Sequence, residues 1–193
     1  MRKVILRMYI TLDGYAAFPK YPGSGDPPKD ETDPVSYEMW VRHWKSTDTI
    51  LFDRTTYEQW SDFWPSSKRK RSEHRYYHDF SHFLDVAQKI VFSRMPWKAE
   101  WKNTRIMRGD LATAITQLKK EPGKNMALVG GTGLAQELMQ KNLIDEYFLA
   151  VFPVILGKGP PLFDKLRKQV TLRLVRAKSC KYGEVVLHYE TVR

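Results

Sequence analysis

Glycines and polar residues follow three apolar runs of the chain, at the points where strands are expected to end. In "VGGTG" (129–133), glycines stand between an apolar run and a helix-like pattern. Glycine permits a tight turn, and it also lets a ligand approach the backbone closely. The free N–H groups and positive dipole end of a helix N-terminus suit a phosphate group. From this segment alone, both interpretations of the turn stay open.

Two other strand ends carry residue types that bind phosphate. In "LFDRTTYE", Arg54 can donate a forked pair of hydrogen bonds, and Thr55 and Thr56 offer hydroxyl groups at a helix N-terminus. In "VFSRMPW", Ser93 and Arg94 directly follow a strand. Ligands of open α/β sheets bind outside the carboxyl ends of the strands, so three such turns favour an extended polyanion such as a dinucleotide. The Rossmann fingerprint G-x-G-x-x-G after the first strand is absent.

Hydrophobic periodicity predicts the elements that would position these groups. Strands are expected at 3–11, 47–52, 89–93, 104–108, 125–131, 143–156, 170–180 and 184–192. Helices are expected at 33–46, 53–64, 73–88, 110–121 and 132–142. Alternating strands and helices predict an α/β fold with a mainly parallel sheet covered on both faces. The last two strands should form an antiparallel hairpin, and we expect residues 1–193 to form a single domain.

Composition and charge restrict the partners. The 193 residues contain no apolar run near the roughly 20 residues of a membrane span, so no membrane association is expected. Cys180 is the single cysteine, which fits a reducing, cytoplasmic compartment. The net charge of +10 is partly concentrated in residues 66–75, "SSKRKRSEHR". Such a run is typical of a solvated loop, and nucleic-acid binding is not favoured because no RNA-binding signature accompanies it.

Two acids are candidates for catalysis. Asp13 in "TLDG" and Glu38 on the first predicted helix carry carboxyl groups that could deliver a proton to a bound substrate. The alternative for Asp13 is a turn with Gly14, and the alternative for Glu38 is a solvent-facing position. His74, His78 and His82 recur at helical spacing, but H-E-x-x-H is absent and no metal site is expected.

Five segments in order resemble one family over nearly the whole chain: "TLDGYAA", "DRTTYE", "KIVFS", "ALVGGTGLAQELM" and "LIDEYFLAVFPVILGKGPPLF". The chain resembles the dihydrofolate-reductase-like reductases related to the reductase half of the bacterial riboflavin deaminase-reductase. The resemblance implies a mixed sheet of about eight strands that binds NADPH. The long apolar segment 143–156, together with the resemblance, predicts that part of this segment lines a homodimer interface.

The resemblance also implies a role for each phosphate-binding candidate. Contacts to the cofactor phosphates fall on Arg54, Thr55 and Thr56, and the 2′-phosphate and adenosine ribose fall on Ser93 and Arg94. The turn that binds the pyrophosphate corresponds to Gly130, Gly131, Thr132, Gly133 and Leu134. The loop that flanks the nicotinamide corresponds to Ala16 and Ala17.

Asp53 stands where the family usually has glycine. A carboxylate would repel a pyrophosphate. Asp53 therefore points away, caps the following helix, or lowers the affinity for the cofactor.

The sequence thus predicts an NADPH-dependent oxidoreductase that transfers a hydride to a small heterocyclic or carbonyl substrate. The resemblance points to a pterin or a riboflavin precursor as that substrate, as in 5-amino-6-(5-phosphoribosylamino)uracil reductases and dihydrofolate reductases. The zinc signature of a deaminase is absent, so the chain would correspond to the reductase half alone. The alternatives are a non-catalytic nucleotide-binding protein on the same fold and an RNA-binding module.

Overall fold

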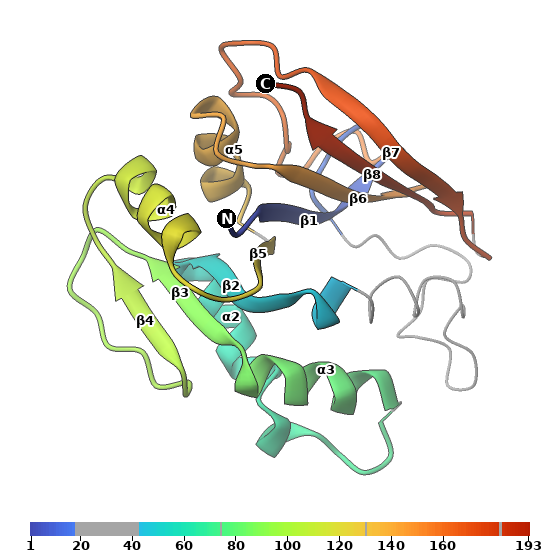
Figure 1. Ribbon diagram of the computed structural model, residues 1–193. Coiled ribbons are helices and arrows are strands. Elements are labelled where there is room, and N and C mark those ends of the chain that lie inside the picture. The colour runs from blue at the N-terminus through green and yellow to red at the C-terminus, as the bar shows by residue number, and fades with distance from the viewer. Residues whose placement is uncertain (18–42, 74, 130, 182) are drawn as a thin grey trace.

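A computed structural model describes residues 1–17, 43–73, 75–129, 131–181 and 183–193. Their strands form one eight-stranded sheet of order β4-β3-β2-β5-β1-β6-β8-β7 (Figure 1). The strands are β1 (Val4–Thr11), β2 (Thr47–Asp53), β3 (Gln88–Phe92), β4 (Thr104–Met107), β5 (Asn125–Val129), β6 (Glu146–Phe152), β7 (Leu172–Ser179) and β8 (Val185–Thr191). In this order, each strand from β4 to β6 is parallel to its neighbour, and β8 pairs antiparallel with both β6 and β7. The predicted mixed sheet with a C-terminal hairpin is confirmed.

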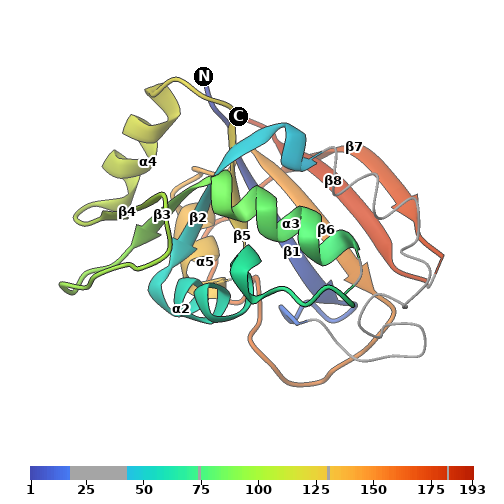
Figure 2. The same ribbon diagram turned by 90° about the horizontal axis from the view of Figure 1, so that it is seen from below.

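Helices cover both faces of the sheet (Figures 1 and 2). They are α2 (Arg54–Phe63), α3 (Arg75–Val86), α4 (Leu111–Lys120) and α5 (Thr132–Gln140), with a short 3₁₀ turn η1 (Ser66–Lys68) between α2 and α3. Buried side chains of α4 and α5 pack on one face against β1 and β5, and those of α2 and α3 pack on the other face against β2. None of the helices in the described ranges is long and apolar enough to cross a bilayer.

The segment 143–156 differs from its prediction as one long strand. Strand β6 ends at Phe152, because Pro153 lacks an amide N–H and the Val154 N–H donates to the Phe152 carbonyl at 2.8 Å. β6 lies between β1 and β8, and its inner residues are buried there. Packing within the monomer therefore accounts for the apolar character of β6, whereas Ile155 beyond the strand is 74% exposed.

A lysine inside the core is an unexpected feature of β3. Lys89 is fully buried, and its ammonium group donates to the carbonyls of Leu84 at 2.5 Å and Ala87 at 2.8 Å, near the end of α3. It also lies 4.7 Å from the centre of the Trp101 ring. Burial disfavours the charged form and lowers the pKa of Lys89 from 10.5 to about 8. The lysine therefore satisfies two carbonyls at an electrostatic cost.

This cost predicts a pH-dependent stability. Between about pH 8 and 10.5 the unfolded chain keeps the proton that folded Lys89 has released, so the free energy of unfolding should rise with pH by up to about 1.4 kcal/mol per unit. Urea denaturation at pH 7.5, 8.5 and 9.5 measures this slope in the parent and in Lys89→Met. The variant should lose the rise, and identical slopes in the two proteins would contradict the assignment.

Candidate functional site

The order of the parallel strands gathers the candidate groups along one edge of the sheet. β3, β2, β5, β1 and β6 are successive neighbours with the same direction, so the segments that follow them emerge at the same edge. Ser93 follows β3, Asp53 ends β2, Gly131 lies just beyond β5 and Asp13 follows β1. The residues at the predicted phosphate-binding turns and the predicted acid Asp13 therefore lie along one line across the sheet.

Asp53 joins the N-termini of α2 and α5. One of its carboxylate oxygens, Oδ1, accepts a hydrogen bond from the Thr56 N–H at 2.8 Å and thereby caps α2. The other oxygen, Oδ2, faces Gly131, the N-cap of α5: a Cβ placed on Gly131 would overlap it. That Cβ would also lie 3.3 Å from the Thr56 hydroxyl oxygen. The structure thus confirms one of the three alternatives for Asp53: its side chain caps the following helix.

The N-terminus of α5 is open toward the sheet edge. Gly131 has φ of +69°, in the left-handed region that favours glycine, and no side chain of the described residues caps the helix. Thr132 is half-buried and Gly133 is exposed. The Leu134 side chain is buried in the core, so only its backbone N–H can contribute to a site. These first amides remain free of a side-chain cap and suit an anion.

The residues of the first turn of α2 differ in accessibility. Arg54 is exposed, donates to Glu58 Oε1 at 2.7 Å and lies 5.5 Å from the centre of the Trp97 ring. Thr55 is exposed, whereas Thr56 is buried with its hydroxyl group toward Gly131. Trp97 was not singled out in the sequence, because nothing local to it predicts that it stacks on Arg54.

At the end of β3, Ser93 closes the ladder to β4. Its N–H donates to the Met107 carbonyl at 3.2 Å, and its hydroxyl group donates to the Met95 carbonyl at 3.2 Å. Ser93 is half-buried, and Arg94 is exposed beside it. The pair is thus accessible at the outer end of the line of candidates.

Asp13 ties the end of β1 to the segment that follows β6. Its carboxylate accepts hydrogen bonds from the Thr11 hydroxyl group at 2.6 Å, from the Leu156 N–H at 3.1 Å and from the Gly157 N–H at 2.7 Å. The hydrogen bond from Thr11 and those from the two amides lower the pKa of Asp13 to about 2. Asp13 is therefore ionised at neutral pH, which favours a structural role and disfavours proton donation.

The loop after Asp13 is held to the same segment. The Ala16 N–H donates to the Pro160 carbonyl at 2.8 Å, and Ala16 and Ala17 are half-buried. Gln136 of α5 is buried and donates to the Pro161 carbonyl at 2.8 Å, which links this segment to α5. The only signal for Gln136 in the sequence is an amide within the apolar stripe of a helix.

Two of the predicted site residues, Glu38 and Gly130, lie outside the described residues, as do His74 of the histidine series and most of the predicted helix 33–46. His78 is half-buried and His82 is exposed on α3. In the part of the chain that the structure describes, no three metal-ligating side chains come together.

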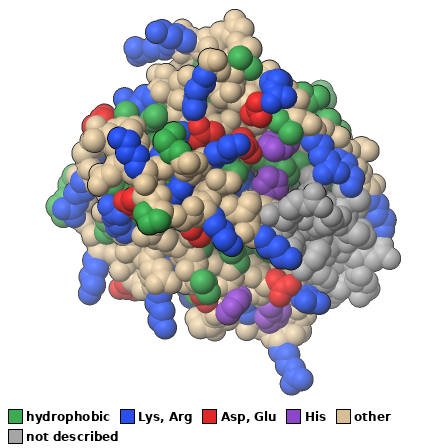
Figure 3. All heavy atoms as spheres, in the orientation of Figure 1, with side chains coloured by type: hydrophobic (Ala, Val, Ile, Leu, Met, Phe, Trp, Pro, Cys, Tyr) green, Lys and Arg blue, Asp and Glu red, His purple; other side chains and the backbone are tan. Residues whose placement is uncertain are grey.

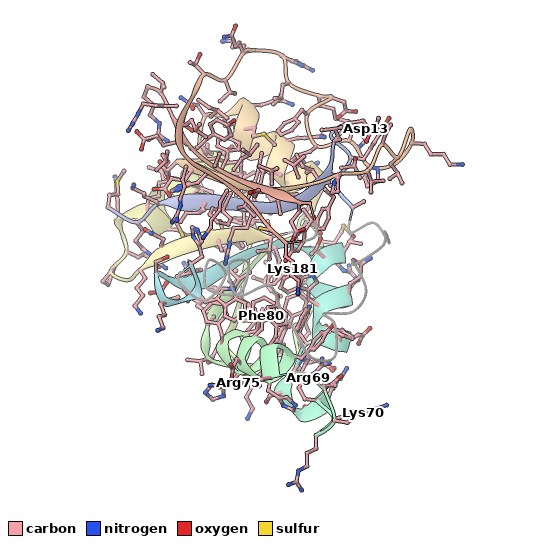
Figure 4. The ribbon with its side chains drawn as sticks, turned by 90° about the vertical axis from the view of Figure 1, so that its right-hand side faces the viewer. Asp13, Arg69, Lys70, Arg75, Phe80 and Lys181 are labelled. Atoms are coloured by element: carbon pink, nitrogen blue, oxygen red, sulfur yellow. The ribbon has the colours of Figure 1, made fainter. Side chains whose placement is uncertain are left out.

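Basic residues of the segment 66–75 lie far from Asp13. Figure 4 places Arg69, Lys70 and Arg75 at the opposite end of the molecule from Asp13. Lys68 donates to the Asp62 carbonyl at 2.7 Å and Arg69 donates to the Phe63 carbonyl, both at the C-terminus of α2. On the face seen in Figure 3, lysines and arginines are dispersed among other residues. Two of the basic residues thus stabilise a helix end.

The fold is dihydrofolate-reductase-like. Dihydrofolate reductase from Enterococcus faecalis, complexed with NADP(H), matches 99% of this chain and 97% of its own with a TM-score of 0.60 and 12% identity. A pyrimidine reductase-like protein from Corynebacterium diphtheriae matches 100% of this chain and 92% of its own (TM-score 0.64, 14% identity). RibD of Acinetobacter baumannii matches the whole of this chain with 58% of its own (TM-score 0.67, 18% identity).

The family model of the RibD C-terminal domain matches residues 2–188, and the chain belongs to this family. YwjB of Bacillus subtilis (strain 168), described as an uncharacterized protein, is 30% identical over 189 residues, which cover 97% of each chain. The resemblance found in the sequence is thereby confirmed at the level of family and fold.

The contact between Gly131 and Asp53 predicts a coupled effect on stability. Gly131→Ala should cost about 1–2 kcal/mol for its left-handed backbone and more for the overlap with the Asp53 carboxylate. Asp53→Gly removes the overlap, so Gly131→Ala should cost less in that background. Chemical denaturation of the four proteins of this double-mutant cycle measures the coupling.

Gly157→Ala is the matched control for backbone strain alone. Gly157 has φ of +73°, and a Cβ on it would meet nothing within 4 Å. A Gly131→Ala cost that equals the Gly157→Ala cost and stays the same with and without Asp53 would contradict the proposed overlap.

Proposed function

We propose that this chain is an NADPH-dependent reductase that transfers a hydride to a small heterocyclic or carbonyl substrate. The observation that carries the proposal is the open N-terminus of α5 on the edge where Arg54, Ser93 and Arg94 also emerge. Membership of the RibD C-terminal domain family and the fold shared with a dihydrofolate reductase support it. By family relation, the substrate class is a pyrimidine precursor of riboflavin or a pterin.

The donor set fits a nucleotide with several phosphate groups at all but one position. The α5 amides at Thr132 and Gly133 would hold the pyrophosphate with the Thr55 hydroxyl group and Arg54, and Ser93 and Arg94 would hold the 2′-phosphate. The exception is the carboxylate of Asp53, which shares the junction of α2 and α5.

When bound, NADPH supplies the hydride, and the protein supplies binding and orientation. The segment 156–161 and the loop with Ala16 and Ala17 would border the reacting end, because Asp13 fixes them to each other. Asp13 orients these backbones as a carboxylate, so it is not assigned to proton delivery. In this proposal Glu38 is the remaining candidate for the proton source.

The cofactor assignment predicts a preference for NADPH over NADH. Charge-assisted hydrogen bonds to the 2′-phosphate are each worth about 1.5–3 kcal/mol, so the dissociation constants should differ by about tenfold or more. Isothermal titration calorimetry with both nucleotides measures the preference, which Arg94→Ala should reduce. Arg105→Ala is the matched control, since Arg105 lies in β4 and pairs with Glu121. Equal affinity of the parent for both nucleotides would overturn the assignment.

Catalysis is tested separately from binding. NADPH oxidation, followed by absorbance, should depend on an added phosphoribosylaminopyrimidine or a dihydropterin. Tight NADPH binding without oxidation by any substrate of these classes would favour the non-catalytic alternative. The RNA-binding alternative has less support, because Lys68 and Arg69 hold the end of α2.

We also propose that the chain forms a homodimer through exposed apolar residues of the segment that follows β6. Ile155 is 74% exposed and Leu156 is 40% exposed. Ile155→Glu would place a charge at such an interface, so sedimentation velocity at micromolar concentrations should show a dimer for the parent and a monomer for the variant. A parent that sediments as a monomer throughout this range would refute the proposal.

A further inference from the structure

The Asp53 carboxylate is placed where the N-termini of two helices meet. Oδ1 accepts from the Thr56 N–H of α2, and Oδ2 lies against Gly131 at the start of α5. Both helices direct the positive ends of their dipoles toward this junction. The carboxylate therefore provides, within the protein, the negative charge that a bound phosphate group would provide.

The two oxygens make the carboxylate difficult to displace. Movement of Asp53 would release the cap of α2. The first turn of α2 contains no acidic residue that could supply the negative charge instead. Movement toward α5 is blocked by the backbone at Gly131, where even one added carbon would overlap Oδ2. A pyrophosphate bound to the α5 amides would consequently lie near a like charge that stays in place.

We propose that Asp53 is an internal anion of the phosphate-binding junction and lowers the affinity of this chain for nucleotides that contain a pyrophosphate. This inference rests on the proposed function and adds a residue that sets cofactor affinity. It also assigns opposite effects to two neighbours: Arg54 attracts the phosphates and Asp53 repels them.

The test compares Asp53→Asn and Asp53→Gly with the parent. Asparagine caps a helix as well as aspartate does, so Asp53→Asn removes the charge and keeps the cap. Isothermal titration calorimetry with NADPH at low salt should give a dissociation constant lower by about tenfold for each variant, or about 1.4 kcal/mol. High salt should reduce the difference, since screening weakens repulsion between accessible charges.

Asp110→Asn is the matched control. Asp110 caps α4 in the same way, with its Oδ1 accepting from the Thr113 N–H at 2.8 Å, but it follows β4, two strands from β2. The affinity of the Asp110→Asn variant for NADPH should match that of the parent. Adenosine 2′-monophosphate lacks the pyrophosphate and should bind the parent and Asp53→Asn equally well. Circular dichroism and thermal melting verify that each variant is folded.

The outcomes separate the inference from the function on which it rests. A parent that binds NADPH, with Asp53 variants that bind it equally or less tightly, overturns the inference and leaves the proposed function standing. The inference is also overturned if Asp110→Asn tightens binding as much as Asp53→Asn does. Binding by the variants alone supports the inference and refutes NADPH use by the parent. Absence of binding by parent and variants overturns both.

Discussion

The parallel pairing of β1 with β5 on one side and β6 on the other is the constraint on which the rest of the structure depends. β1 pairs Arg7 with Val129 of β5 and Thr11 with Phe152 of β6. This register determines the level at which each strand ends, and hence the level at which the following backbone emerges. A slip by one residue would turn the buried side chains of β1 to the opposite face and would separate the segments after β1 and β6. Asp13 reinforces the register, because its carboxylate reaches the backbone beyond β6 only in this alignment.

Features governed by neighbouring residues could be predicted from the sequence, and contacts between distant segments could not. The helix predicted at 110–121 agrees with α4, which Asp110 caps, and the predicted C-terminal hairpin is also present. For Asp53, the sequence permitted capping among other roles, but its contact with Gly131 depends on the pairing of β2 with β5. The burial of Lys89 was missed, because a strand with one lysine gives no sign that the carbonyls of a preceding helix will surround the ammonium group.

The candidate site shows the same division. Glycines and hydroxyl groups near strand ends were found because their residue types and positions are distinctive. The role of Asp13 was open, since its partners are backbone amides at 156 and 157, and backbone amides carry no signature in a sequence. The same limit applies to the basic segment, where Lys68 and Arg69 bind carbonyl groups at the end of α2. A local charge count therefore overstated how much positive charge this segment presents to a partner.

Helix α2 carries a complementary charge at each end: the Asp53 carboxylate at its N-terminus and the cations of Lys68 and Arg69 at its C-terminus. This arrangement stabilises the helix whether or not a ligand is present. A site built only for phosphate would leave the N-termini of α2 and α5 without negative charge whenever the ligand is absent. An internal carboxylate removes that dependence, and it does so with the same charge that opposes an incoming phosphate. With the proposed function, stability of the free protein and affinity for a polyanion are thus in direct conflict at this junction, and Asp53 places the balance on the side of stability.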